Sequence, residues 1–218
     1  MKQSVAGLLA GCGKVFVLCP HTDDEFGCAG TIARLVDAGA AVRYLALSRC
    51  EESVPAGYPA DILFRECMAA TRALGIAAEY VEVGSFKVRH FPRDRQDILE
   101  KLHCVSDAYR PDLVLLPSSF DMHQDHRTVF EEGFRAFKHA TLLGYELPQN
   151  LISFNNTAFV ALSDRYVRKK IAALSRYRSQ AHRPYSNEDF VKGLARMRGV
   201  QCGAPYAEAF EAIRLVVR

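Results

Sequence analysis

The chain has 218 residues, of which 49% are hydrophobic and 24% are charged, and its formal net charge is +3. Such a length and composition are typical of a globular protein with one full hydrophobic core, so we expect a single domain over residues 1–218. The small net charge and the absence of a Lys/Arg-rich run argue against a nucleic-acid partner. No apolar run reaches the roughly 18 residues that span a bilayer, so we expect no transmembrane segment.

The cysteines and the N-terminus both bear on the cellular compartment. Seven cysteines, an odd number, are irregularly spaced and form no CxxC pair. This pattern matches neither a disulfide framework nor a cysteine-rich zinc site, and it fits a reducing environment. The first ten residues lack the apolar core of a signal peptide. We therefore expect a cytoplasmic protein.

Short apolar runs alternate with longer amphipathic segments through the first two-thirds of the chain. In chain order the pattern predicts strand 15–20, helix 27–38, strand 42–48, helix 62–74, strand 79–83, helix 94–109, strand 113–117 and helix 127–138. The alternation indicates parallel strands joined by right-handed crossovers, and strands that are apolar throughout indicate that both faces of the sheet are covered. We therefore predict an α/β fold with a Rossmann-like, mostly parallel sheet flanked by helices.

Beyond residue 140 the pattern becomes less regular. Apolar periodicity predicts strands at 151–154 and 158–162 and helices at 164–178, 187–198 and 206–213. The Gly and Pro residues between these segments separate short elements and do not form a linker. The single-domain prediction therefore extends to this part of the chain.

Two polar segments each come directly after a predicted strand. The sequence PHTDDE at 20–25 follows the first strand, and HQDH at 123–126 follows the fourth. In an open α/β sheet, ligands bind at the carboxyl ends of the strands, where the strand order reverses. If the order is third, second, first and fourth, the first and fourth strands are neighbours about 4.8 Å apart. We expect the two segments to face each other across one crevice.

Together the two segments contain three histidines, three aspartates and a glutamate. It is costly to bury so many ionisable groups in one place unless a cation neutralises them. Two imidazoles and one carboxylate, with the fourth position open, are the ligand pattern of catalytic zinc. Iron, cobalt and manganese also accept such ligands. The residues thus predict a catalytic divalent-metal centre, with Zn²⁺ as the first candidate.

Each segment taken alone has a simpler interpretation. The acidic residues 23–25 would serve as the cap and first turn of the following helix. A His-x-x-His pair at the start of a helix is commonly a surface or capping feature. The placement of both segments at the ends of neighbouring strands favours the metal site.

Other classes of active site have less support in the sequence. The glycines at 11–13 precede the first strand, whereas a phosphate-binding loop would follow it, and Gly27 and Gly30 do not form a GxGxxG motif. Three carboxylates in the same turn would also repel a pyrophosphate. A serine or cysteine hydrolase is not supported, because no GxSxG occurs and no cysteine has a histidine partner in a plausible motif.

The two segments resemble the signature motifs of the PIG-L / LmbE-like N-acetylglucosaminyl deacetylases. The likeness continues in the glycine-rich stretch 27–31, in Arg65-Glu66 with the Leu-Gly pair at 74–75, in Ser179-Gln180 and in the YAEAF sequence at 206–210. It therefore covers residues 15 to about 215. Thr22 and Gln124 stand where proline is common in the motifs, and Tyr177 stands where many members have histidine.

The resemblance implies a metal-ligand set and a catalytic base. His21, Asp24 and His126 would bind zinc. Asp23 would be the general base that takes a proton from the water that zinc activates. His123 would stabilise the oxyanion or protonate the leaving amine.

It also implies supporting roles for further residues. Asp125 would orient His123 or a ligand histidine, as carboxylates around metal sites do. Arg65, together with Asp121 and Glu51, would hold the hydroxyl groups of the substrate. Glu25 would belong to the start of the helix or support a ligand.

The reaction expected from the resemblance is zinc-dependent hydrolysis of an N-acetyl group on an amino sugar, a conjugate of the N-acetylglucosamine type. The expected partner is thus a small N-acetylated sugar or its conjugate, and a homo-oligomer is compatible with the analogy. An alternative is another reaction of activated water on the same scaffold, either hydration of an unsaturated acid or hydrolysis of a different amide. The motifs specify the activated water and not the electrophile, so they leave this choice open.

Overall fold

A single mixed sheet organises residues 12–217, which are those that the computed structural model describes. Its seven strands lie in the order β3-β2-β1-β4-β5-β7-β6. The strands are β1 (Lys14–Cys19), β2 (Ala41–Ala46), β3 (Val81–Val83), β4 (Leu113–Pro117), β5 (Thr141–Tyr145), β6 (Ala158–Leu162) and β7 (Tyr206–Arg214). Strands β3 through β5 run parallel, and β7 runs antiparallel to both of its neighbours. The prediction of a Rossmann-like, mostly parallel sheet is confirmed.

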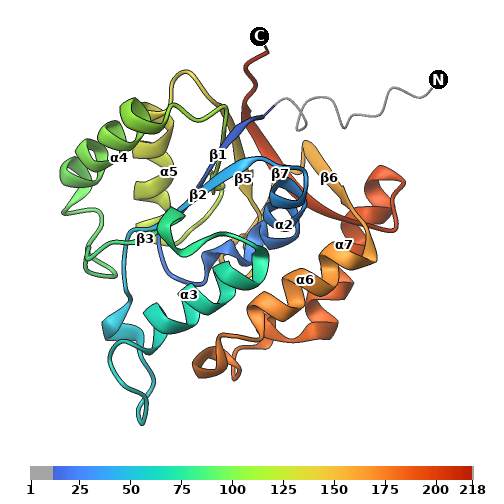
Figure 1. The fold of residues 1–218 in the computed structure, drawn as a ribbon, viewed down its shortest axis with the longest axis horizontal. Helices are drawn as coiled ribbons and strands as arrows, with labels where there is room; N and C mark the ends of the chain where they lie inside the picture. Colours follow the sequence, from blue (N-terminus) through green and yellow to red (C-terminus); the bar gives the residue numbers. More distant parts are fainter. Residues whose placement is uncertain (1–11, 218) are drawn as a thin grey trace.

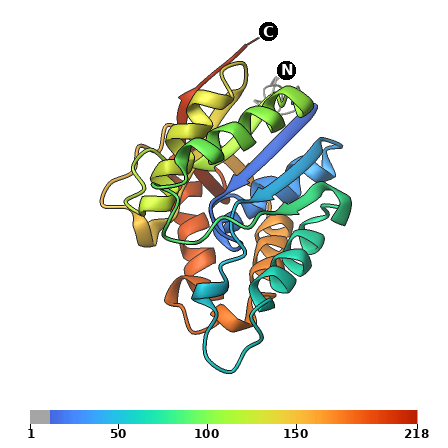
Figure 2. The ribbon, with the colours of Figure 1, turned by 90° about the vertical axis from the view of Figure 1, so that its left-hand side faces the viewer.

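Helices cover both faces of this sheet (Figures 1 and 2). They are α2 (Ala29–Asp37), α3 (Ile62–Leu74), α4 (Arg95–Tyr109), α5 (Gln124–Ala136), α6 (Asp164–Leu174) and α7 (Glu188–Cys202). Helices α4 and α5 pack together on one face, and α6 packs with α2, α3 and α7 on the other. Among residues 12–217, no helix combines the length and the apolar character needed to cross a membrane.

Strand β1 shows why the strands are apolar throughout. Val15 and Val17 belong to the buried cluster beneath α2, α3, α6 and α7. Phe16 and Leu18, which point the other way, belong to the cluster beneath α4 and α5. Because alternate side chains of a strand face opposite sides of the sheet, each position of β1 from Val15 to Cys19 buries apolar surface.

The carboxyl ends of β1 and β4 lie side by side, as predicted. The two strands pair in parallel, with Val15 opposite Leu113 and Val17 opposite Leu115. After β1 the chain enters a short 3-10 helix, η1 (Asp24–Gly27), before α2 begins. After β4 it leads into α5, which begins three residues earlier than predicted, at Gln124. The HQDH segment therefore occupies the start of α5.

The segment 206–213 was expected to be helical, and this prediction is wrong because the segment forms strand β7. Its alanines and glutamates favour a helix locally, but its backbone pairs with β5 on one side and β6 on the other. Glu208 is buried and accepts hydrogen bonds from the backbone N–H groups of Gly30 and Thr31 and from Lys170. Tertiary contacts with α2 and α6 thus explain a glutamate in this strand.

Other differences also lie in the C-terminal part. The predicted strand 151–154 is reduced to a single bridge between Leu151 and Asp121, and strand β5 was not predicted. The helix predicted for 164–178 ends at Leu174, and the chain continues through a short 3-10 helix, η5 (Arg178–Gln180). These turns bring Gln180 and its neighbours toward the carboxyl ends of the strands.

Two glycines of α7 offer a matched test of the packing of this helix on β7. A methyl group on Gly199 would lie 2.6 Å from the carbonyl oxygen of Ala204 and 2.8 Å from Cα of Tyr206, whereas nothing lies within 4 Å at Gly193. We expect Gly199→Ala to lower the free energy of unfolding by about 1–3 kcal/mol. Gly193→Ala should raise it by about 0.5–1 kcal/mol through helix propensity. Urea unfolding of both variants measures these changes, and equal stabilisation by both would contradict the close packing.

Candidate metal and active site

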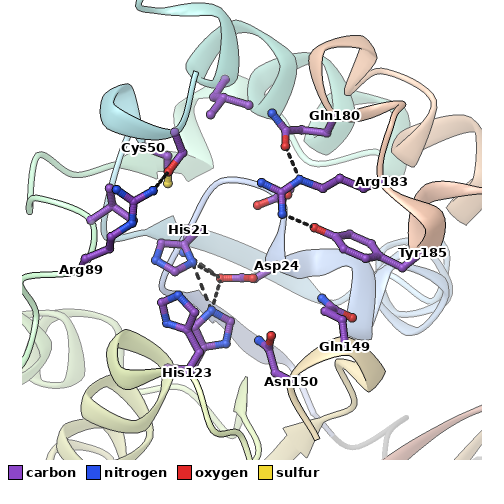
Figure 3. Close-up of a pocket in the computed structure, with 15 residues that line it drawn as sticks. His21, Asp24, Cys50, Arg89, His123, Gln149, Asn150, Gln180, Arg183 and Tyr185 are labelled. Atoms are coloured by element: carbon purple, nitrogen blue, oxygen red, sulfur yellow. Dashed lines mark hydrogen bonds and ion pairs between the residues drawn. The ribbon is translucent and has the colours of Figure 1, made fainter. Parts of the chain in front are cut away.

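The site begins with the turn that follows β1. The backbone N–H of His21 donates to Oδ2 of Asp24 at 2.8 Å, so the carboxylate is folded back toward the histidine that precedes it. Both side chains are buried. His126 enters from the first turn of α5 and is also buried. The two segments predicted to face each other therefore meet (Figure 3).

Two aspartates orient the two buried histidines. Nε2 of His21 lies 3.0 Å from Oδ2 of Asp125, and Nδ1 of His126 lies 2.8 Å from Oδ2 of Asp121. An ionised carboxylate can only accept, so each of these ring nitrogens carries the proton. The opposite nitrogens, Nδ1 of His21 and Nε2 of His126, are left with free lone pairs, as in metal-binding histidines held by carboxylates.

Those lone pairs converge with a carboxylate oxygen. Nδ1 of His21 lies 3.1 Å from Nε2 of His126, and Oδ2 of Asp24 lies 3.4 Å from each of these nitrogens. In a tetrahedral zinc site with bonds of about 2.0–2.1 Å, ligand atoms are separated by about 3.3–3.4 Å. Three electron-rich atoms at such separations repel one another unless a cation lies between them, so this donor set fits a divalent metal.

The carboxylates around His126 also affect the pKa of its imidazole. Burial works against the charged imidazole, but Asp24 and Asp121 outweigh it and raise its pKa. Burial likewise works against the charge of Asp125, while hydrogen bonds from His21 and from the backbone of Arg89 lower its pKa. The carboxylates around the histidines therefore favour positive charge at this point.

His123 is the third histidine of the cluster, and its ligand atom lies within 4.8 Å of those of His21 and His126. It caps α5, and its Nδ1 accepts from the backbone N–H of Asp125 at 3.2 Å. This bond places the proton of the neutral ring on Nε2. Burial, followed by the neighbouring His126 and His21, lowers its pKa, so the ring is neutral near pH 7. His123 thus presents a neutral N–H donor as a lining residue of the pocket.

Asp23 lines the same pocket beside Asp24. Burial and the adjacent charge of Asp24 raise its pKa, while His21 and Arg183 act in the opposite direction. A carboxylate with a raised pKa is a stronger base than an ordinary one. The position and the basicity of Asp23 both suit proton transfer inside the pocket.

The three residues predicted to hold substrate lie in three different places in the structure. Asp121 is buried behind His126, accepts its Nδ1–H and also accepts from Asn150 at 3.3 Å. Arg65 is not among the residues that line the pocket, its side chain is 64% exposed, and it donates to Asp61 at 2.7 Å. Glu51 is exposed on a short 3-10 helix, η2 (Glu51–Ser53), and does not line the pocket.

Glu25 lies behind the pocket and is not among the converging donor atoms. Its buried carboxyl accepts from the hydroxyl of Tyr177 at 2.7 Å and from that of Tyr44 at 3.3 Å. Burial raises its pKa to about 8, against the opposing effect of the Tyr177 hydrogen bond. Tyr177 also donates to the carbonyl oxygen of Thr22. The tyrosine that departs from the family pattern therefore supports the turn that carries Asp23 and Asp24.

The pocket over these residues has a volume of about 240 Å³. Sites for drug-sized ligands are commonly about 300–1,000 Å³, so this one encloses a smaller group. Sequence reasoning missed several polar lining residues, which are Arg89, Gln149, Asn150, Gln180 and Arg183. Of these residues, only Gln180 belongs to a motif that the sequence analysis identified, the Ser179-Gln180 pair. The others come from loops whose paths no local pattern predicts.

Comparison with known proteins identifies the family. The family model of PIG-L, the GlcNAc-PI de-N-acetylases, matches residues 16–137. An uncharacterised deacetylase of Escherichia coli K12, YaiS, is 23% identical over 173 residues, which are 76% of this chain and 90% of that protein.

Solved structures with the same fold include enzymes of two kinds. N,N'-diacetylchitobiose deacetylase from Pyrococcus horikoshii matches with a TM-score of 0.77 at 19% identity, over 96% of this chain and 87% of that one. The 4-carboxy-2-hydroxymuconate hydratase from Pseudomonas putida KT2440 matches with a TM-score of 0.75 at 21% identity, over 94% of this chain and 98% of that one. The fold alone therefore does not select the reaction.

Proposed function

Because this chain belongs to the PIG-L family of de-N-acetylases, we propose that it is a zinc-dependent hydrolase that removes an N-acetyl group from an amino sugar or its conjugate. The observation that carries this proposal is the convergence of His21 Nδ1, His126 Nε2 and Asp24 Oδ2 at 3.1–3.4 Å. These residues would hold the metal. When bound, the ion would lower the pKa of a water to around 7 and polarise the amide carbonyl.

Asp23 would act as the general base of this reaction. It would take one proton from the water as the water oxygen bonds to the amide carbon. The bond from carbon to nitrogen then breaks, the proton taken from the water passes to the nitrogen, and the products are acetic acid, which ionises to acetate, and a free amine. A base positioned in this way typically contributes about 10²–10⁴-fold to the rate.

His123 would stabilise the negative charge that develops on the carbonyl oxygen. Its Nδ1 is engaged by the backbone of Asp125, so the Nε2–H is the donor that remains. A neutral imidazole can supply such a hydrogen bond without bringing another charge into the site. Asp125 would keep His21 oriented, and Asp121 would do the same for His126.

Release of a free primary amine from a panel of N-acetylated amino sugars is the test of the proposal, with zinc-loaded protein and Asp23→Asn alongside. Release by the wild type and not by the variant would support the reaction. The alternative of a hydratase has the same need for activated water, and it would form no amine. Failure to release amine from any member of the panel by protein with one bound zinc would reject the deacetylase proposal.

His123→Ala separates the catalytic role of this histidine from a ligand role. We expect the variant to retain one zinc per chain and to lose activity by about 10²–10³-fold, the loss typical of one oxyanion donor. Metal analysis by mass spectrometry and kcat measurement provide the two readouts. Loss of zinc from His123→Ala would show instead that His123 completes the ligand set.

A further inference from the structure

Two buried tyrosines contact both ends of the turn that carries Asp23 and Asp24. Tyr177 lies between α6 and η5, and Tyr44 belongs to β2, so they approach the turn from different elements. Neither tyrosine is among the residues that line the pocket. Any effect that they have on the reaction therefore passes through the turn.

The first end of the turn is the carbonyl group of Thr22, in the peptide bond that joins Thr22 to Asp23. Its oxygen lies within hydrogen-bond distance of the Tyr177 hydroxyl and 3.2 Å from the Tyr44 hydroxyl. In the described part of the chain, the buried hydroxyl of Thr22 itself has no hydrogen-bond partner. The side chain of Thr22 therefore does not fix the turn, whereas the two tyrosines contact its backbone.

The second end is Glu25, the residue after Asp24. Its Oε1 lies 2.7 Å from the hydroxyl of Tyr177, and its Oε2 lies 3.3 Å from that of Tyr44. Burial raises the pKa of both tyrosines well above the usual value, so both hydroxyl groups keep the proton that they donate. Each can donate to the carbonyl oxygen of Thr22 or to the carboxyl group, and together they span the turn.

The two carboxylates between these ends take their position from the backbone of the turn. The side chain of Asp23 makes no capping hydrogen bond to η1, and Oδ2 of Asp24 accepts from the backbone N–H of His21, within the same turn. A displacement of this backbone would move both carboxylates in the pocket. Catalysis is sensitive to such changes, because a misplacement of about 1 Å can cost about 10²-fold in rate.

Resting on the proposed function, we propose that Tyr177 is a positioning residue for the reaction, with Tyr44 as its weaker partner. The hydroxyl of Tyr177 holds the backbone on both sides of Asp23 and Asp24, so that the base and the metal ligand keep their places relative to each other. Tyr177 makes the shorter contacts of the two tyrosines, so its loss should have the larger effect. It stands where many members of the family have histidine, so the role is assigned to this chain.

Tyr145 provides a matched control within the same buried cluster. Tyr145, Tyr44 and Tyr177 all belong to the core beneath α2, α3, α6 and α7, and Tyr145 is 1% exposed against 4% for Tyr177. Its hydroxyl donates to the carbonyl oxygen of Leu18 at 3.1 Å, on β1 and before the turn. Replacement of either tyrosine by phenylalanine removes one buried hydroxyl and keeps the ring. Thermal melting of Tyr145→Phe and Tyr177→Phe measures the cost of that loss as such.

Metal binding is the first readout, because it requires no substrate. We expect Tyr177→Phe to weaken zinc affinity by about 10-fold in competition with a chelator, the lower end of the range for residues that orient a ligand. The visible absorption bands of bound Co²⁺ depend on ligand geometry, and they should shift in Tyr177→Phe and stay unchanged in Tyr145→Phe. Tyr44→Phe should give a smaller change in the same direction, and it carries the test if Tyr177→Phe does not fold.

The kinetics of amine release provide the second readout. At saturating zinc, kcat of Tyr177→Phe should fall by about 10-fold while KM stays within about twofold, because the tyrosine contacts the turn and not the substrate. Tyr145→Phe should keep both constants. A split of this kind separates a positioning role from a general loss of stability.

Two results would overturn the proposal. One is a folded Tyr177→Phe with the zinc affinity and the Co²⁺ absorption of the wild type. The other is an equal change of both in Tyr177→Phe and Tyr145→Phe, which would reduce Tyr177 to a packing role. Both results are obtained with the metal alone, so failure of the wild type to release amine is a separate outcome that rejects only the deacetylase proposal.

Discussion

Replacing His126 by alanine is expected to remove the bound metal and the amine-releasing activity together. The imidazole of His126 supplies one of the three converging atoms, 3.1 Å from Nδ1 of His21 and 3.4 Å from Oδ2 of Asp24. Without it only two donors remain, and the buried Asp121 loses the hydrogen bond from Nδ1 of His126. Loss of a residue that merely orients a ligand costs about 10- to 100-fold in metal affinity, so loss of the ligand should exceed that range.

Metal content by mass spectrometry and amine release should be measured on the same preparation. His103→Ala is a suitable control, because His103 is exposed on α4 and tests whether any surface histidine contributes metal. Asp24→Asn removes a second proposed ligand and should give the same joint loss if His126→Ala proves unstable. A stoichiometric zinc in both variants would refute the ligand set.

Asp23→Asn is expected to separate metal binding from catalysis. The variant keeps the shape of the side chain and the ligands His21, Asp24 and His126, so zinc should remain at one per chain. The amide side chain has no basic lone pair for the proton of the attacking water, and kcat should fall by about 10²-fold or more. Measurement of kcat and of metal content on one sample distinguishes this result from that of His126→Ala.

Asp61→Asn is the control for loss of an aspartate charge elsewhere on the protein. Asp61 is an aspartate outside the pocket, bound to Arg65 on the surface. Its replacement should leave kcat unchanged within about twofold. Full activity of Asp23→Asn would show that another group accepts the proton, and loss of zinc from that variant would place Asp23 among the ligands.

The candidate site could be predicted from the sequence because its parts follow local patterns. The strands 15–20 and 113–117 are short apolar runs, and each is followed at once by residues that can ligate a metal. Parallel strands with helical crossovers bring their carboxyl ends to one edge of the sheet. The partnership of β1 and β4, and with it the approach of His21 to His126, could therefore be expected before any contact was known.

The roles of the supporting residues could not be predicted from local sequence patterns. Asp121 was expected to hold substrate, and in the structure it accepts a hydrogen bond from Nδ1 of His126. Arg65 was given the same role, yet its side chain turns to Asp61 four residues earlier, on the outer surface of α3. The position of a residue in the sequence indicates whether it lies near the end of a strand. The direction of its side chain depends on how other helices, strands and loops pack around it.

The sequence by itself determined the mostly parallel α/β core and the two polar segments at its edge, since both follow from periodicity and from residue chemistry along short stretches. Only the tertiary structure decided that 206–214 is a strand, because its pairing with β5 and β6 outweighs the helix propensity of its alanines and glutamates. It likewise decided that Arg89 and Arg183 reach the pocket. Arg89 is placed there by hydrogen bonds to Asp125 and Gln124, and Arg183 by the turns that follow α6, contacts between segments that no local pattern encodes.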